Sequence, residues 1–250
     1  MNTIDILNKH IALCLDIRAK SYHTITLFDA LNSIRTGKYR TQIENIRRLY
    51  HLGKSAIAGY KSKKKQLPSF IFSGTLFDTR FKFDICSYTS LMIVDIDKLE
   101  SVDSIKDKLK NDPHIIATWL SPSGNGLKAL VYLEYDKKYP YANTWIYHEH
   151  CAFPQIEKYL REAYDLNIDP SGDDITRLCF VSYDPDIHLK REFTPFKVSC
   201  NLSNNQINKI RWRYNFSRKN IRNALKEQKR IAKLLKESSQ KDSDDKNLSL

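Results

Sequence analysis

Two carboxylates stand two residues apart at the end of an apolar run. Leu91-Met-Ile-Val94 leads directly into Asp95, and Asp97 follows after one more residue. Side chains at positions i and i+2 of a strand point to the same side, so we expect both carboxylates on one face. Such close like charges repel, and a divalent cation relieves the repulsion. Oxygen ligands favour Mg²⁺ or Mn²⁺ over zinc. The alternative is a strand-end pair in solvent or bound to Lys98.

A second candidate is the glycine-rich loop Ser121-Pro-Ser-Gly-Asn-Gly-Leu-Lys128. Gly124 and Gly126 would let the backbone approach a ligand closely, and Ser121 and Ser123 would offer donors to phosphate. Lys128 would add a cation. The spacing is not that of a Walker A loop. The alternative is a plain hairpin loop, with its Asn-Gly pair as the turn signal.

The third candidate lies in the segment from Leu166 to Phe180. Asp169 precedes a proline, and Arg177 stands at the front of an apolar stretch. On this segment alone, a turn-forming Asp-Pro and a surface ion pair are the better interpretations. If Asp169 were brought beside the Asp95 and Asp97 pair, however, three carboxylates would form a metal site. Arg177 could then neutralise phosphate charge.

The elements that must position these residues follow from residue type. Short stretches rich in β-branched and aromatic residues predict strands. They are residues 70–72, 90–96, 115–120, 127–133 and 178–182. Helices are expected at 102–109 and 143–164, and the chain up to about Gly59 reads as helical. The Lys61-Ser-Lys-Lys-Lys65 run is equally consistent with a phosphate contact and with a solvated connector. We therefore predict a mixed α/β domain over residues 1–200, its sheet covered by helices on at least one face.

The remainder of the chain, residues 201–250, reads as a basic helical tail. Between Lys209 and Glu237 there are eleven Lys or Arg and two Glu. The candidate nucleic-acid contacts there are Arg211, Arg213, Arg218, Lys219 and Arg222. Trp212 or Tyr214 could stack on a base, although packing onto the domain is the alternative for both. Residues 238–250 are polar, which predicts a disordered end.

Composition narrows the class of protein. The formal charge of +12 indicates an acidic partner, of which nucleic acid is the commonest. No apolar run is long enough for a membrane span, and the N-terminus lacks a signal-peptide core, so we expect no membrane partner and a cytoplasmic location. The five cysteines form no CxxC pair, which disfavours a zinc ribbon or a disulfide framework.

The three motifs in this order resemble the archaeo-eukaryotic primase (PrimPol) superfamily. Within it, the chain is most similar to the VirE N-terminal type of primase-like domain found in Bacteroidetes and their mobile elements. The segments Leu67-Pro-Ser-Phe-Ile-Phe-Ser-Gly-Thr75 and Tyr88-Thr-Ser-Leu-Met-Ile-Val-Asp-Ile-Asp-Lys-Leu99 carry the same character. The resemblance spans roughly Leu27 to Pro185.

This resemblance implies an RRM-like catalytic sheet with an N-terminal α/β unit, in the α+β class, followed here by the basic helix. It implies primer synthesis or extension on single-stranded DNA, or on RNA, from nucleoside triphosphates with Mg²⁺ or Mn²⁺. Asp95, Asp97 and Asp169 match the metal-binding catalytic positions. The nucleotide-binding positions fall on Ser121, Ser123, Gly124, Gly126, Lys128 and Arg177.

One position departs from the family pattern. Many of these primases have histidine where Lys128 stands, and lysine keeps the cation but loses a group that titrates near neutrality. Arg80 is a further nucleotide candidate, for which a surface salt bridge is the better interpretation. The departure favours nucleotide binding more than turnover.

Two other functions compete with a primase. A catalytically weak accessory would keep the fold and bind nucleic acid in a replication or mobile-element complex. In either case we expect any helicase to be a separate polypeptide. A Toprim-type nuclease or primase also uses a DxD motif, but it needs an acidic residue next to glycine upstream, and none precedes Asp95.

Overall fold

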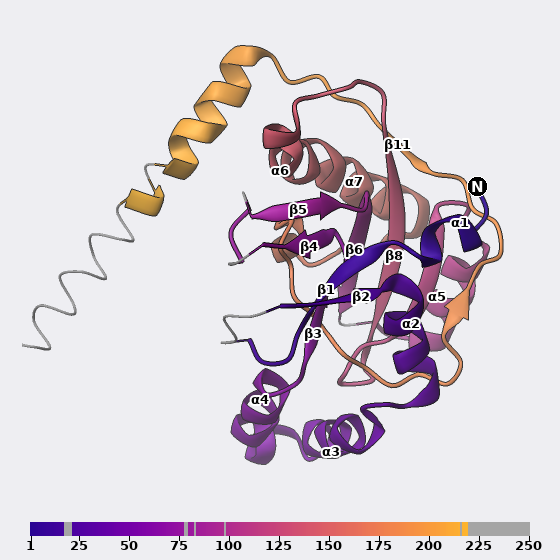
Figure 1. The fold of residues 1–250 in the computed structure, drawn as a ribbon. Coiled ribbons are helices and arrows are strands. Elements are labelled where there is room, and N and C mark those ends of the chain that lie inside the picture. Colours follow the sequence, from indigo (N-terminus) through magenta and orange to yellow (C-terminus); the bar gives the residue numbers. More distant parts are fainter. Residues whose placement is uncertain (18–21, 78–79, 83, 98, 216, 220–250) are drawn as a thin grey trace, which may run out of the picture. The chain divides into compact units, whose positions relative to one another are not determined.

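The structure is a computed structural model that describes residues 1–17, 22–77, 80–82, 84–97, 99–215 and 217–219. The chain divides into two compact units, Met1–Asn201 and Leu202–Leu250. Each unit is described by itself. The three sequence motifs all belong to the first unit, which Figure 1 shows as a body of packed sheets and helices.

The first sheet is antiparallel and has the strand order β2-β1-β3-β9. Its strands are β1 (His10–Cys14), β2 (His23–Thr26), β3 (Ser69–Ile71) and β9 (Cys179–Phe180). A separate hairpin joins β4 (Gly74–Leu76) to β5 (Ile85–Tyr88). Strand β9 begins two residues after Arg177, and its pairing with β3 fixes the position of this part of the chain in the first sheet.

The second sheet is organised around the long strand β8 (Gly126–Tyr135). Strands β6 (Leu91–Asp97) and β7 (Ile115–Leu120) both pair antiparallel with it. Strand β10 (His188–Leu189) extends the sheet beyond β7, and β11 (Phe196–Val198) pairs parallel with the end of β8. The first two motifs therefore lie on neighbouring strands.

Helices connect and cover these sheets. They are α1 (Ile4–Leu7), α2 (Leu27–Thr36), α3 (Arg40–His51), α4 (Ile57–Lys65), α5 (Val102–Asn111), α6 (Thr144–Tyr147) and α7 (Phe153–Tyr164). Short helical turns are η1 (Gly53–Ala56), η2 (Tyr141–Asn143), η3 (His148–Ala152, a π-helix) and η4 (Pro170–Asp173). The hydroxyls of Thr26 and Ser101 accept bonds from the first-turn amides of α2 and α5, which fixes where these helices begin.

The main core lies between the two sheets. Ile11, Phe70 and Leu13 of the first sheet share it with Leu91, Ile93, Trp119 and Leu130 of the second, and helices α2, α3 and α4 add Leu27, Ile34, Ile46 and Tyr60. Helices α5 and α7 cover the opposite side of the second sheet (Figure 1). Leu91 and Ile93 lie on the same face of β6 as Asp95. One end of this face is therefore part of the apolar core, and the other end carries carboxylates.

Most of the predicted elements are confirmed. The mixed α+β class is correct, the strands expected around residues 70, 93, 117 and 130 all form, and the helix expected at 102–109 is α5. The helix expected at 143–164 forms as α6, η3 and α7 in succession. Among the described helices, none combines the length and apolar composition needed to cross a bilayer. All five cysteines are free.

Two expectations about the N-terminal region were wrong. The chain up to Gly59 is not helical throughout, because β1 and β2 precede α2 and form the first sheet. Their period-two pattern is short and mixed with polar residues on β2, which is largely exposed. The Lys61–Lys65 run is not a connector, since it forms the last part of α4.

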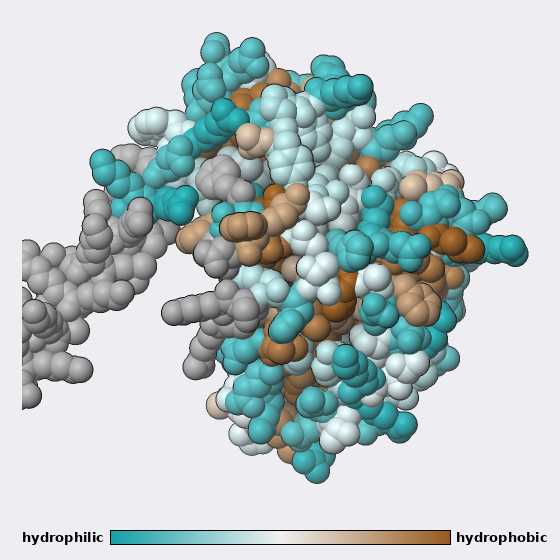
Figure 2. Space-filling model, viewed as in Figure 1, coloured by the Kyte–Doolittle hydropathy of each residue, from teal (hydrophilic) through white to brown (hydrophobic). Residues whose placement is uncertain are grey.

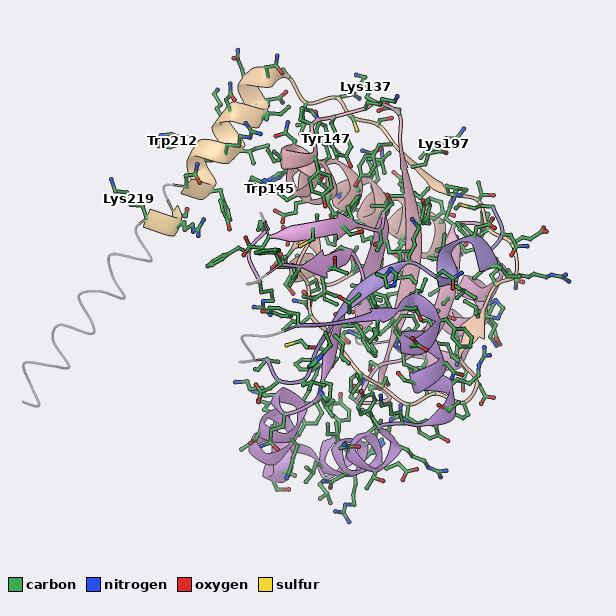
Figure 3. The ribbon with its side chains drawn as sticks, in the orientation of Figure 1. Lys137, Trp145, Tyr147, Lys197, Trp212 and Lys219 are labelled. Carbon is green, nitrogen blue, oxygen red and sulfur yellow. The ribbon has the colours of Figure 1, made fainter. Side chains whose placement is uncertain are left out.

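In the second unit, residues 204–215 and 217–219 are helical. Arg211 and Arg213 belong to the first of these stretches and Arg218 and Lys219 to the second, and Trp212 is 65% exposed. Trp212 and Lys219 project from the helix into solvent (Figure 3). Arg222, the rest of the predicted helix to Glu237 and the end at 238–250 lie outside the described residues.

Candidate functional site

The three motifs meet in one cleft of about 720 Å³. A volume in this range suits a ligand the size of a nucleotide. The cleft is lined by Asp95, Asp97, Ser121, Ser123, Lys128, Asp169 and Arg177 from the motifs, together with Arg80. These residues come from segments that are far apart in the sequence, and the fold brings them to one place.

Strand pairing sets the centre of the cleft. Asp95 of β6 lies directly opposite Lys128 of β8, and their side chains form an ion pair. Asp95 is 6% exposed and Lys128 is 9% exposed. Burial favours the neutral amine, but the neighbouring negative groups, Asp95 first among them, together outweigh it and raise the pKa of Lys128 above its ordinary value. Lys128 therefore carries a full positive charge at neutral pH.

Arg177 links two carboxylates across the cleft. Its Nη2 donates to Asp169 at 2.7 Å and lies 3.3 Å from Asp95. The two carboxylate oxygens are therefore no more than about 6 Å apart. The backbone amide of Asp169 also donates to the carbonyl of Asp95 at 3.0 Å, so the segment with Asp169 runs along β6.

Asp169 has a structural contact as well as its place in the cleft. Its carboxylate accepts bonds from the amide of Ser171 at 3.0 Å and from its hydroxyl at 2.7 Å, which caps η4. Partial burial raises the pKa of Asp169. The bonds from Ser171 and the charge of Arg177 lower it by more, so the pKa lies below its usual value. The turn-forming role and the ion pair expected from the segment alone are both present, and both are part of the cleft.

Asp97 completes the acidic edge at the outer end of β6. It lies two residues beyond Asp95 on the same strand face, and unlike Asp95 it is exposed. Its strand partner is Gly126, where a Cβ atom would lie 2.6 Å from the carbonyl oxygen of Ile96 and 2.9 Å from Oδ1 of Asp97. Only glycine fits here without moving the strand that carries both carboxylates.

The loop between β7 and β8 is a compact hairpin loop with serine hydroxyls in the cleft. The Oγ atoms of Ser121 and Ser123 are 3.0 Å apart, and the amide of Ser121 donates to the carbonyl of Gly126 at 2.8 Å. Gly124 has a φ of +77°, in the left-handed region that favours glycine. The hairpin interpretation is therefore correct for its geometry. The loop also lines the cleft, and its binding of phosphate stays a prediction.

Arg47 of α3 holds this loop from behind, and the sequence motifs did not indicate it. Its Nη2 donates to the carbonyl of Tyr183 at 2.7 Å and lies 3.4 Å from the carbonyl of Ser121. Its side chain packs against Gly124. A lone arginine inside an amphipathic helix gives no signal in the sequence, because its partners are backbone carbonyls far along the chain.

A buried ion pair supports the end of β7 in the same way. Lys106 of α5 donates to Asp184 at 2.7 Å, and the same carboxylate oxygen accepts the amide of Leu120 at 2.9 Å. This fixes the strand end from which the loop departs. Asp174, which also lines the cleft, accepts bonds from the amide and the hydroxyl of Thr176, both at 2.8 Å.

The carboxylates fit Mg²⁺ or Mn²⁺ in donor type, because oxygen ligands suit these ions. In this arrangement Lys128 and Arg177 hold the Asp95 carboxylate, and among the described residues no three acidic, histidine or cysteine side chains are grouped closely enough to hold a metal ion together. A metal ion would therefore have to displace one or both cations from Asp95.

Further aromatic and basic residues line the cleft. They are Tyr50, Tyr60, Lys61, Lys64, Lys65 and Phe180. The predicted contacts Arg211, Arg213, Arg218 and Lys219 belong to the second unit.

Comparison with known protein families gives a match. The family described as BT4734-like, N-terminal domain, matches residues 62–188. No curated protein and no solved structure matches the chain. The matched residues include all three motifs and the paired strands β6 and β8. Because the match covers just over half of the chain, this protein belongs to the BT4734-like N-terminal domain family.

Proposed function

We propose that this chain is a primase-like nucleotidyltransferase that binds a nucleoside triphosphate in the cleft and adds nucleotides to a strand on a single-stranded template. The observation that carries the proposal is the chain of contacts from Lys128 to Asp95, Arg177 and Asp169, which joins all three motifs in one cleft. Surface ion pairs at unrelated positions would not share carboxylates in this way.

The order of elements supports the same proposal. Strand β6, helix α5, strands β7 and β8 and helix α7 follow one another, and the segment ending at Asp169 then runs beside β6. This is the β-α-β-β-α-β order of ferredoxin-like and RRM-like sheets, with an irregular segment in place of the last strand. Asp95 and Asp97 lie on β6, and Asp169 lies on the segment that runs beside it.

In this proposal the donors and cations of the cleft bind phosphate, and its carboxylates bind metal. Ser121, Ser123 and the loop amides would hold the triphosphate, with Lys128 and Arg177 neutralising its oxygens. Asp95, Asp97 and Asp169 would hold Mg²⁺ or Mn²⁺, which when bound supply activation of the 3′-hydroxyl and stabilisation of the leaving pyrophosphate. Release of Lys128 and Arg177 from Asp95 toward phosphate would free its oxygens in the same event.

Primer extension tests the proposal. The assay uses a single-stranded template, labelled nucleotides and Mn²⁺, and compares the wild type with Asp95→Ala/Asp97→Ala and with the single variant Asp97→Asn. Because Asp97 is exposed, Asp97→Asn should keep the fold and lose most synthesis. Glu134→Gln, an exposed carboxylate on β8 that does not line the cleft, is the matched control. Equal synthesis by Asp97→Asn, the double variant and the wild type would show that these carboxylates are not catalytic.

A second candidate function is a weakly catalytic accessory that binds nucleotide and strand beside a separate helicase. The pairing of Lys128 with Asp95 favours it, because an internal cation already neutralises the carboxylate that a metal ion would need. This function predicts nucleotide binding with no synthesis in Mg²⁺ or Mn²⁺, and the same binding after Asp97→Asn.

A further inference from the structure

Helix α4 turns three lysines toward the cleft. Lys61, Lys64 and Lys65 are spaced i, i+3 and i+4, which places them on one side of the helix, and all three line the cleft. Lys63 is on another side of the same helix, is exposed and does not line the cleft. Helix α4 lies beside α3 at the lower end of the domain in Figure 1.

These lysines carry charge that the domain does not neutralise. Within the described part of the chain, the cleft's other central cations, Lys128 and Arg177, form ion pairs with carboxylates, whereas the three α4 lysines form none. The space-filling view shows mainly hydrophilic residues over α3 and α4 (Figure 2). A row of unpaired cations at the rim of a cleft attracts a polyanion.

Aromatic rings stand among the lysines. Tyr50 of α3 packs on Tyr60 with ring centroids 5.3 Å apart, and Nζ of Lys64 lies 5.8 Å from the centroid of Tyr60 and 5.8 Å from that of Phe180. Tyr50 and Phe180 are partly exposed, so each has ring surface open to the cleft. The hydroxyl of Tyr50 accepts a bond from Asn125 at 3.1 Å, which ties this surface to the serine loop.

The arrangement of lysines and rings on this side of the cleft suits a single nucleic-acid strand better than a nucleoside triphosphate. A triphosphate needs donors and cations gathered at one point, which the serine loop and Lys128 provide. Cations along one helix, with partly exposed rings from α3 and β9 beside them, suit a phosphodiester chain whose bases can stack, as in proteins that bind single strands without sequence preference. A duplex keeps its bases paired and offers no ring faces for such stacking.

We propose that Tyr50, Lys61, Lys64, Lys65 and Phe180, here named the α4 wall, bind single-stranded nucleic acid and direct it across the nucleotide cleft. The proposal rests on the proposed function, in which the neighbouring cleft binds the nucleotide. It moves the main strand contact from the second unit, where the sequence suggested it, to the first.

Strand binding in the absence of nucleotide and metal tests the α4 wall separately from catalysis. The measurement is fluorescence anisotropy of a labelled mixed-sequence oligonucleotide in EDTA, with the full chain, over a range of salt concentrations. Lys61→Ala/Lys64→Ala/Lys65→Ala is compared with Lys63→Ala/Lys108→Ala/Lys197→Ala. The control set removes the same charge from exposed lysines outside the cleft lining, and Lys197 points away from the domain in Figure 3.

The expected result is a loss of at least tenfold in affinity for the α4 variant and less than threefold for the control. The slope of log K against log salt should become shallower by about 2 in the α4 variant, since each phosphate contact on a single strand contributes about 0.7. Tyr50→Leu should lose about tenfold, whereas Tyr50→Phe, which keeps the ring, should bind as the wild type does. Urea unfolding verifies that each variant is folded.

Three results would overturn the proposal. They are no strand binding by the wild type, equal losses in the two lysine sets, and a loss of triphosphate binding in the α4 variant with strand binding retained. The last would assign the α4 lysines to the nucleotide. These outcomes are independent of the primer-extension result for Asp97→Asn, so a failure of the α4 wall and a failure of the proposed catalysis are distinguishable.

Discussion

Lys128 and Asp95 form an ion pair between adjacent strands, with both side chains almost fully buried. Arg177 contacts the other oxygen of the same carboxylate. One buried carboxylate thus holds two cations from separate segments, and the pair contributes to the fold as well as to the cleft.

The first prediction concerns stability. Asp95→Asn leaves Lys128 charged and buried without its carboxylate, and we expect a loss of about 3 kcal/mol in the free energy of unfolding. Lys128→Met should cost less, because Arg177 remains beside Asp95. The double variant should recover part of the loss, as expected for groups in direct contact. Urea unfolding measures all three, and strictly additive losses would contradict the coupling.

The second prediction concerns Arg47. Arg47→Ala removes the donor to the carbonyls of Tyr183 and Ser121, so the serine loop loses its support from α3. We expect nucleotide affinity, measured by titration calorimetry, to fall roughly tenfold, a loss of about 1.4 kcal/mol. Arg48→Ala is the control, since Arg48 donates to Asn45 on its own helix. Equal affinities for both variants would show that the loop does not depend on Arg47.

The third prediction concerns Gly126. In Gly126→Ala the new methyl group would clash with the carbonyl of Ile96, and we expect a destabilisation of about 2 kcal/mol together with weaker nucleotide binding. Gly59→Ala is a matched control in helix α4, where the nearest atom to an added Cβ is 3.9 Å away. That variant should be more stable by about 0.5–1 kcal/mol. A thermal melt that ranks the two variants in the opposite order would contradict the close approach at Gly126.

The fourth prediction is a pH dependence at His148. This residue is 2% exposed, shares a 2.9 Å hydrogen bond with Tyr88, and burial lowers its pKa to about 3. Between about pH 6.5 and 3 the unfolded chain binds a proton at this site that the folded chain does not, so stability falls as the pH falls. His148→Gln should therefore lose less stability than the wild type between pH 6.5 and 4 in urea unfolding.

The neighbouring Glu149 provides the control of opposite sign. Burial raises its pKa to about 7, against the attraction of Lys82, so the folded state holds a proton that the unfolded state releases above about pH 4.5. Its contribution to stability is lost as the pH rises toward 7, and Glu149→Gln should remove that loss. Parallel pH profiles for the wild type and both variants would contradict these assignments.

The sequence predicted the parts of the site that depend on local pattern. The apolar run before Asp95 identifies β6, and the Asn-Gly pair identifies the hairpin between β7 and β8. The pairing of β6 with β8, which brings the two motifs together, was not predicted from the sequence. The sequence could not show β1 and β2, whose apolar and polar residues do not alternate cleanly. It could not reveal Arg47 or the direction of the α4 lysines, because both depend on where α3 and α4 pack.

The continuity of one face of β6 has a consequence for misfolding. Leu91 and Ile93 fill the core, and Asp95 and Asp97 reach the cleft, all by the same alternation. A slip of one residue in the pairing with β8 would move Asp95 and Asp97 to the helix-covered face of the sheet. It would also move Leu91 and Ile93 out of the core. Every shift of this strand by an odd number of residues would bury Asp95 and Asp97 under the helices and is therefore unfavourable. The residues proposed to bind metal thus also help to fix the register of the sheet.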